Sequence, residues 1–302
     1  DIAREIAERE LLLIVTPEPE EVKKQIAAIV NMENVRFLEC GTNDTWARDH
    51  GAITMMDADG PSLLDFTFNG WGLKFASHLD NQITRHAVEN GILKGRYVNR
   101  LGFVLEGGSI ESDGMGTLLT TSECLLSPNR NGQKNKVEIE EYLKSVFQVR
   151  QILWLDDGYL AGDDTDSHID TLARFCPADT IVYVQCEDET DEHYEALQAM
   201  EEQLHSFRTL NGEPYRLLAL PMADKIVEEG ERLPATYANF LILNGTILYP
   251  TYNQPENDRR ACEVLQEAFP GYQMVGIDCR PLIKQHGSLH CVTMQYPLGV
   301  LK

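Results

Sequence analysis

Five amphipathic helices recur along the chain at intervals of roughly 55 to 65 residues, and short β-rich runs lie between them. Each helix is marked by apolar residues at positions i, i+3, i+4 and i+7. The helical stretches are residues 20–30, 78–91, 137–147, 191–204 and 259–269. A pattern that repeats at this interval predicts five similar units, each with one helix and about three strands.

The β-rich runs end at glycine, asparagine or proline, which mark turns. Examples are residues 51–56, 62–68, 116–121, 180–185 and 245–250. The run "FLILNGTILYP" places Asn244 and Gly245 between two apolar strands, a pattern typical of an antiparallel hairpin. Alternating helices and strands indicate an α/β fold, and the hairpin disfavours a purely parallel, doubly wound sheet. No Pro- or Ser-rich linker divides the sequence, so we expect one domain over residues 1–302.

The chain is strongly acidic, with a formal charge of −22. This charge argues against a nucleic-acid partner, because phosphate binding needs clustered lysine and arginine, and it favours a small cationic molecule. The sequence contains neither GxGxxG nor GxxxxGK[ST], which removes the usual case for a bound nucleotide. No apolar stretch is long enough to cross a bilayer, so no membrane partner is expected.

The seven cysteines have no CxxC spacing, so they indicate neither a disulfide framework nor a zinc site. The first ten residues, "DIAREIAERE", are too charged for a signal peptide. A reducing, cytoplasmic environment therefore fits the sequence best. The sequence leaves the oligomeric state open, including a homo-oligomer.

Two segments before residue 122 carry candidate site residues, and the first of them combines acidic, basic and aromatic side chains. "TNDTWARDHG" contains Trp46, Asp49 and His50, which could form part of a functional site. Equally, the segment could be structural, with an ion pair between Asp44 and Arg48 and with Trp46 packed in the core. Glu106 precedes two glycines, which suggests a tight turn that presents a carboxylate or, equally, a β-bulge.

A third segment, "GDDTDSHIDTLARF", is rich in aspartate around His168 and Asp170. If this segment is extended, residues two positions apart share a face, so His168 and Asp170 would point to one ligand as a base and a carboxylate. A metal site is the competing interpretation, because hard cations bind carboxylates. The order of acidic residues does not fit a calcium-binding EF-hand.

Near the end of the chain, the strand-like run "HGSLHCVTMQ" places Cys291 directly after a histidine. Cysteine is among the most buried residue types, so a packed thiol competes with a nucleophile at this position.

Six segments together resemble successive motifs of the agmatine deiminase family, which includes the Porphyromonas-type peptidylarginine deiminases. They are "NDTWARDHG", "FNGWG", "EGGSIESDGMGTLLTTSECLLSPNRN", "GDDTDSHID", "YANFLILNG" and "GSLHCVTMQ", in order from about Asn43 to Gln295. The resemblance implies a five-bladed, pseudo-symmetric α/β propeller, the pentein fold, with a central active site. It agrees with the five units expected from the helical repeat.

The resemblance also implies roles for individual residues. It places the nucleophile on Cys291 and the catalytic His-x-Asp pair on His168 and Asp170, with Asp49 as a further catalytic carboxylate. The residues that it places around the substrate are Trp46, Trp71, Glu106 and Asn239. The other six cysteines match no catalytic position and are expected to serve packing.

The sequence departs from the family pattern beside these residues. "WGG" is "WGL" here, "GGGNIHC" is "KQHGSLHC", and "TDSHID" replaces the usual segment with Asn before Gly-His-x-Asp. The family's N-terminal strand with its Pro-Ala-Glu-Trp motif is absent from this sequence, so the deiminase domain is expected to lack it. We therefore expect intact chemistry and an altered substrate pocket.

This resemblance implies hydrolytic deimination of a guanidinium by a thiolate, without a metal or an organic cofactor. Agmatine is the expected substrate, with N-carbamoylputrescine and ammonia as products, in putrescine biosynthesis and polyamine metabolism. Two alternatives remain. One is a deiminase of free or peptidyl arginine, whose α-carboxylate could be met by Lys74, Arg130 or Arg48. The other is a catalytically silent protein that binds guanidines or polyamines.

Overall fold

The computed structural model describes residues 1–302, which divide into two compact units. The first unit comprises Asp1–Gly107 together with Val292–Lys302, and the second comprises Gly108–Cys291. The expectation of one catalytic domain over the whole chain stays a prediction.

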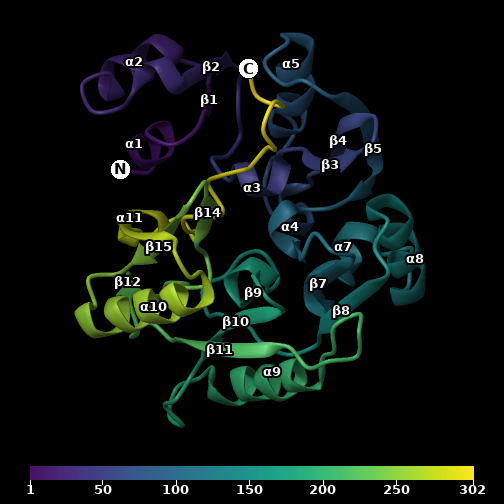
Figure 1. Cartoon of the computed structure of the whole chain (residues 1–302), viewed down its shortest axis with the longest axis vertical. Helices are drawn as coiled ribbons and strands as arrows, with labels where there is room; N and C mark the ends of the chain where they lie inside the picture. Colours follow the sequence, from purple (N-terminus) through teal and green to yellow (C-terminus); the bar gives the residue numbers. More distant parts are fainter. The chain divides into compact units, whose positions relative to one another are not determined.

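The elements of the first unit are short helices and strands (Figure 1). They are α1 (Ile2–Ala7), β1 (Leu12–Thr16), α2 (Pro19–Ile26), η1 (Met32–Asn34), β2 (Val35–Glu39), α3 (Ala47–His50), β3 (Ile53–Asp57), β4 (Gly60–Thr67), α4 (Gly70–Leu73), η2 (Asp80–Gln82), α5 (Ile83–Glu89) and β5 (Arg96–Val104).

The remaining elements begin at Gly107, at the end of the first unit, and continue through the second. The first of them are η3 (Gly107–Ser109), β6 (Ile110–Ser112), β7 (Thr117–Thr121), α6 (Ser122–Leu125), α7 (Pro128–Asn131), α8 (Lys136–Phe147), β8 (Gln151–Leu155), η4 (Ile169–Thr171), β9 (Ala173–Cys176) and β10 (Thr180–Gln185). They are followed by α9 (Tyr194–Ser206), β11 (Arg216–Pro221), β12 (Val227–Glu228), β13 (Glu231–Arg232), β14 (Leu241–Leu243), β15 (Thr246–Thr251), α10 (Pro255–Ala268), β16 (Gln273–Asp278) and α11 (Arg280–Ile283).

One sheet topology occurs four times along the chain. In β3-β4-β5, β6-β7-β8, β9-β10-β11 and β14-β15-β16, the middle strand is antiparallel to the first strand and parallel to the third. Each parallel pair is joined by a helix, as parallel strands require. The β1-β2 sheet has only the parallel pair, with α2 as its connection. The predicted α/β fold with mixed sheets is thus confirmed.

Local sequence explains where several elements begin and end. The predicted hairpin forms between β14 and β15, and Leu243 pairs with Thr246 across the Asn244-Gly245 turn. Gly245 has a φ of +69°, which glycine adopts without steric cost. Helix α8 begins with a capping box between Asn135 and Glu138, which satisfies backbone N–H groups that have no partner inside the helix. All five predicted helical stretches are helical in the structure.

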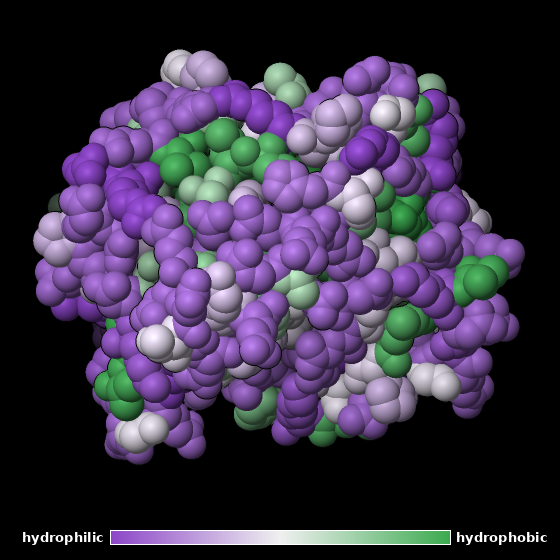
Figure 2. All heavy atoms as spheres, turned by 90° about the horizontal axis from the view of Figure 1, so that it is seen from below, coloured by the Kyte–Doolittle hydropathy of each residue, from purple (hydrophilic) through white to green (hydrophobic).

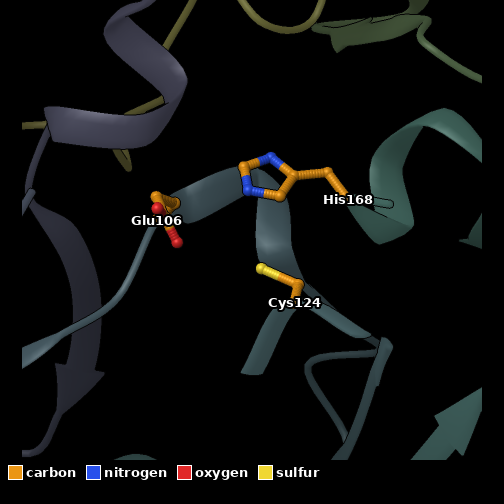
Figure 3. Close-up of side chains that lie close together, drawn as sticks. All are labelled: Glu106, Cys124 and His168. Atoms are coloured by element: carbon orange, nitrogen blue, oxygen red, sulfur yellow. The ribbon is translucent and has the colours of Figure 1, made fainter. Parts of the chain in front are cut away.

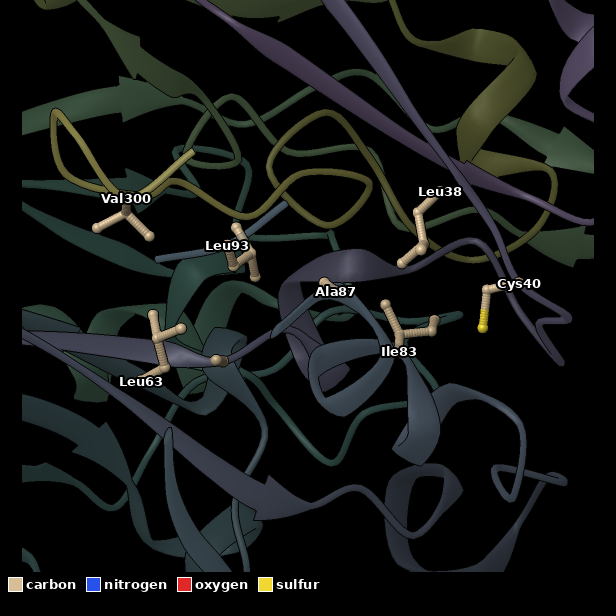
Figure 4. Packing of buried hydrophobic residues seen from close by; sticks show 8 residues of the cluster. Leu38, Cys40, Leu63, Ile83, Ala87, Leu93 and Val300 are labelled. Atoms are coloured by element: carbon tan, nitrogen blue, oxygen red, sulfur yellow. The ribbon is translucent and has the colours of Figure 1, made fainter. Parts of the chain in front are cut away.

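The core of the first unit lies between α5 and its neighbouring strands. Figure 4 shows this packing, in which side chains from distant parts of the sequence meet. The buried members are Leu38, Cys40, Ala52, Leu63, Ile83, Ala87, Leu93 and Val300. Val300 belongs to the C-terminal segment, which also pairs with the chain through a bridge between Leu93 and Leu301. The end of the chain therefore completes the core of the first unit.

The strand-like run at residues 286–295 is not a strand, which corrects the sequence prediction. The run consists of turns and irregular backbone. The backbone N–H groups of His290 and Cys291 donate to the side chain of Asn239 instead of to a neighbouring strand. Apolar alternation predicts a strand only where another strand offers a ladder of partners.

Figure 2 shows one face of the molecule, on which hydrophilic residues predominate and hydrophobic residues form scattered groups. No helix has the length and apolar character that a membrane crossing requires.

Candidate active site

Cys291 lies in a turn, where Asn239 is its neighbour. The Sγ of Cys291 donates to Oδ1 of Asn239 over 3.3 Å, and the same oxygen accepts from the backbone N–H of Cys291 at 3.4 Å. Only 8% of Cys291 is exposed. The thiol is therefore held in a defined position and retains a small accessible surface.

Asn239 connects the Cys291 turn to Asp170. Asn239 is fully buried in the irregular segment before β14. Its Nδ2 donates to the backbone carbonyl of Asp170 over 3.3 Å, and its own backbone carbonyl accepts from the N–H of His290 at 3.1 Å. The structure thus brings together three residues that the sequence analysis assigned to the site, namely Cys291, Asn239 and Asp170.

His168 and Asp170 do not lie on an extended segment, which corrects the geometric argument made from the sequence. His168 precedes the 3₁₀-helix η4, and Asp170 is in its middle. The Oγ1 of Thr171 donates to the carbonyl of His168 over 2.8 Å, and the Oγ1 of Thr165 accepts from its N–H at 3.1 Å. With three residues per turn, residues two positions apart point in different directions. Both side chains are nevertheless almost fully buried.

The carboxylate of Asp170 takes part in a buried polar network that the sequence analysis did not identify. Its Oδ2 lies 2.7 Å from Nδ1 of His290, and Nε2 of His290 lies 3.3 Å from Nη2 of Arg174. The Nε of Arg174 forms an ion pair with Oε2 of Glu111 at 2.9 Å. The position of His290, directly before Cys291, is a sequence signal for a residue of the site. The sequence pattern does not indicate, however, that Asp170 and Arg174 are its partners.

Two carboxylates of the aspartate-rich loop, those of Asp163 and Asp166, bind neighbouring protein groups. Asp163 accepts from Oγ1 of Thr165 at 2.6 Å and from the N–H of Ser167 at 2.8 Å. Asp166 pairs with Arg130 at 2.6 Å. These contacts shape the loop that leads to His168, and they give the aspartates a structural role that does not depend on a cation.

Cys124 lies near His168, as Figure 3 shows. The Sγ of Cys124 and a ring nitrogen of His168 are within 4.8 Å of each other, and Cys124 is fully buried in α6. The sequence predicts a packing role for Cys124. The side chain of Cys124 is therefore packed next to His168, a proposed catalytic residue.

Burial makes four other cysteines poor nucleophiles. It raises the pKa of Cys176 and of Cys279 to about 12, and it also raises the pKa of Cys40 and of Cys186 above the ordinary value. Because the thiolate is the reactive form, a raised pKa lowers reactivity at neutral pH. This agrees with the packing role expected for these residues.

The first unit holds the remaining predicted site residues. The indole Nε1 of Trp71 donates to Oδ2 of Asp49 over 2.9 Å, and both residues are buried. Trp71 has a φ of +55°, a conformation that costs a bulky residue about 1–3 kcal/mol. Its ring makes edge contacts with Phe68 and Phe75 at centroid distances of 4.8 and 5.6 Å. Strain held by specific contacts is typical of functional loops.

Trp46 and Glu106 are also buried in the first unit. Trp46 directly precedes α3, which carries Asp49, and is 6% exposed. Glu106 is fully buried and precedes the 3₁₀-helix η3, so the glycines after it form the predicted tight turn. A Cβ at Gly107 would lie 2.1 Å from the backbone oxygen of Arg48, so only glycine fits there. Arg48 contacts Met294 and Gln295.

His50, next to Asp49, is a buried histidine whose two ring nitrogens have no hydrogen-bond partner. Its ring packs against Phe68, with centroids 5.8 Å apart. Burial lowers the pKa of His50 to about 4, so the side chain is neutral at physiological pH. The sequence analysis placed His50 in a polar cluster, and the structure gives it an apolar contact.

We expect this histidine to make the protein less stable in acid. The unfolded chain binds the proton with a pKa of about 6.5, so stability is lost as the pH falls from that value towards 4. Between pH 7 and pH 5 the loss from this residue is about 2 kcal/mol. Urea unfolding at both pH values measures it, and His50→Leu should remove most of the difference. An unchanged pH dependence in His50→Leu would assign the acid sensitivity to other groups.

Comparisons with known proteins show the family to which the chain belongs. A family model described as Porphyromonas-type peptidyl-arginine deiminase matches residues 1–297. A Marinomonas protein named "Putative agmatine deiminase" is 34% identical over 285 residues, which cover 88% of this chain and 77% of that protein.

Two solved structures share the fold closely. The crystal structure of the "Putative Arginine Deiminase from Porphyromonas gingivalis" has a TM-score of 0.95 at 51% identity, covering 100% of this chain and 89% of that one. A cysteine-to-serine variant of C. jejuni agmatine deiminase with substrate bound has a TM-score of 0.88 at 42% identity, covering 96% and 83% of the two chains.

Proposed function

The chain belongs to the family of Porphyromonas-type peptidyl-arginine deiminases and is a hydrolase of amidine C–N bonds, and from this premise we propose that it deiminates agmatine. The products are N-carbamoylputrescine and ammonia, which places the reaction in polyamine metabolism. The observation that carries the proposal is the contact of Cys291 with Asn239, which also binds the backbone of Asp170. Asn239 thus connects the turn that carries the thiol to the residue whose carboxylate is proposed to bind the cation.

The buried carboxylate of Asp170 suits a guanidinium. A guanidinium is a planar cation with N–H donors arranged in a fork, and a carboxylate accepts from two of them at once. Asp49 is proposed as the second acceptor on the ground of the family resemblance. Trp46, Trp71 and Glu106 are proposed as substrate-binding residues on the same ground.

The proposed reaction has two steps. The thiolate of Cys291 attacks the central guanidinium carbon to give a tetrahedral adduct, and His168 protonates the amino group that leaves as ammonia. An S-alkylthiouronium remains on the cysteine. His168 then takes a proton from water, the resulting hydroxide adds to the same carbon, and the C–S bond breaks to release the thiolate. The added hydroxyl group gives its proton to solvent, which leaves the neutral ureido product. Water is the only other reactant, so no step needs a cofactor.

A deiminase of free or peptidyl arginine is the second candidate function. It is favoured by the 51% identity to the Porphyromonas gingivalis protein, which exceeds the 42% identity to C. jejuni agmatine deiminase. An arginine substrate brings an α-carboxylate that needs a cationic partner. Arg130 does not suit that role, because its guanidinium is fully buried and is paired with Asp166. Of the other two cations that the sequence offers, Lys74 is exposed and Arg48 is buried.

The geometry of the five repeated units supports a finer statement about the fold. Four sheets repeat one topology, and a fifth has its parallel pair, each with a helix as the connection. We propose that these units form the five-bladed α/β propeller implied by the sequence resemblance.

We expect kcat/KM for agmatine to exceed that for arginine by about a hundredfold. Agmatine is a dication at neutral pH, whereas arginine would bury an additional anion in a strongly acidic protein. The measurement is ammonia release from agmatine, free arginine and a peptide that ends in arginine, side by side.

Lys74→Ala makes the comparison sharper. If arginine is the substrate, this variant should lose activity on arginine selectively, with agmatine as the internal control. A higher kcat/KM for arginine or for the peptide in the unaltered protein would replace the agmatine assignment. Ammonia release from none of the three would contradict the proposed function as a whole.

A further inference from the structure

The hydrogen bond between His290 and Asp170 has a direction that the neighbouring arginine determines. Arg174 can only donate hydrogen bonds, so Nε2 of His290, 3.3 Å from Nη2 of Arg174, must offer its lone pair. The ring proton is therefore on Nδ1. From there it is donated to Oδ2 of Asp170 over 2.7 Å.

Arg174 is held so firmly that it can impose this tautomer. Its side chain is 3% exposed and lies in β9, where its Nη1 donates to the backbone carbonyls of Phe240 at 2.8 Å and of Ala238 at 3.2 Å. The guanidinium also lies over the ring of Phe240, 4.6 Å from its centroid. Together with the ion pair to Glu111, these contacts fix its position.

The charges of the network suit a cationic ligand. Glu111 and Asp170 each carry one negative charge, Arg174 carries one positive charge, and His290 in this tautomer carries none, so the four side chains sum to one negative charge. A hydrogen bond donated to a carboxylate stabilises its ionised form. The charge of Arg174 is balanced by Glu111, with which it forms an ion pair.

We infer that His290 is a positioning residue, which Arg174 locks in the Nδ1–H tautomer so that it holds the Asp170 carboxylate ionised and correctly oriented for the substrate guanidinium. This inference rests on the proposed function. Histidines and carboxylates that form hydrogen bonds with a ligand-binding side chain orient it in the same way in other sites. The backbone N–H of His290 also binds Oδ1 of Asn239 at 2.9 Å, so the same residue helps to place the Cys291 turn.

Two amide variants separate this role from simple space filling. In His290→Asn the amide nitrogen can take the place of Nδ1 and donate to Asp170, whereas in His290→Gln the amide reaches the place of Nε2 and faces Arg174. We expect kcat/KM for agmatine to fall by about 10- to 100-fold in His290→Gln and to stay within about tenfold of the unaltered protein in His290→Asn. The loss should appear mainly in KM, because Asp170 is proposed to bind the substrate cation.

The reaction of Cys291 with iodoacetamide, an uncharged reagent, provides the second readout. If His290 acts through Asp170, alkylation should proceed at similar rates in both variants, since no guanidinium is involved. A parallel fall in alkylation would show that the substitutions act through the Cys291 turn. Equal losses of kcat/KM in His290→Asn and His290→Gln would contradict the directed hydrogen bond. Absence of deiminase activity in the unaltered protein would instead refute the proposed function. That outcome is distinct from failure of the inference, which appears only when the two variants are compared.

Discussion

Replacing Cys291 with serine is expected to lower kcat for agmatine by about five powers of ten. A serine hydroxyl is far less acidic than a thiol, whose ordinary pKa is about 8.5, so the nucleophilic anion is not formed at neutral pH. The fold should persist, because a hydroxyl can donate to Oδ1 of Asn239 as the thiol does. Ammonia release and the thermal unfolding temperature measure the two effects.

Cys262→Ser is the matched control. This residue is partly exposed in α10 and has no proposed catalytic role, so its replacement should leave turnover close to that of the unaltered protein. Substantial ammonia release by Cys291→Ser, with the control also active, would contradict the assignment of Cys291 as the nucleophile.

Asp170→Asn is expected to lower kcat/KM for agmatine by about three powers of ten. The substitution removes the negative charge of residue 170. The guanidinium of the substrate would then be buried without that carboxylate as its partner. The amide oxygen of asparagine can still accept from Nδ1 of His290, so the network around it should survive. Steady-state kinetics measure the change, and the unfolding temperature reports on the network.

Asp278→Asn serves as the control for loss of one negative charge. Asp278 forms a surface ion pair with Arg280 at 2.7 Å, and such pairs contribute little to stability or to substrate binding. If both variants lost activity to the same modest extent, the role of Asp170 would reduce to the overall charge of the protein.

Sequence periodicity predicted those parts of the fold that depend on local pattern. The helices have apolar stripes that a window of the sequence reveals, and the Asn244-Gly245 turn carries its conformational preference in its own residues. The mixed sheets followed from these two signals. The resemblance of six motifs gave the site residues, and the structure places Cys291, Asn239 and Asp170 together.

The remaining features depend on contacts between distant residues. His290 contacts Arg174 across 116 positions of sequence and Asp170 across 120, and no pattern within a window reports such a pair. The run around Cys291 resembles a strand in its sequence, but the N–H groups of His290 and Cys291 donate to Asn239, which only the folded chain brings near. The 3₁₀-turn at Asp170 likewise depends on side chain to backbone hydrogen bonds of Thr165 and Thr171.

The most direct test of the central claim is to stop the reaction with agmatine in acid during turnover and to determine by mass spectrometry which residue carries substrate. A covalent adduct is expected on the peptide that contains Cys291, with a mass increase equal to agmatine less ammonia. Chelator-treated enzyme should give the same adduct, because no step needs a metal. Turnover of agmatine with an unmodified Cys291, or with the adduct on another residue such as Cys124, would contradict it.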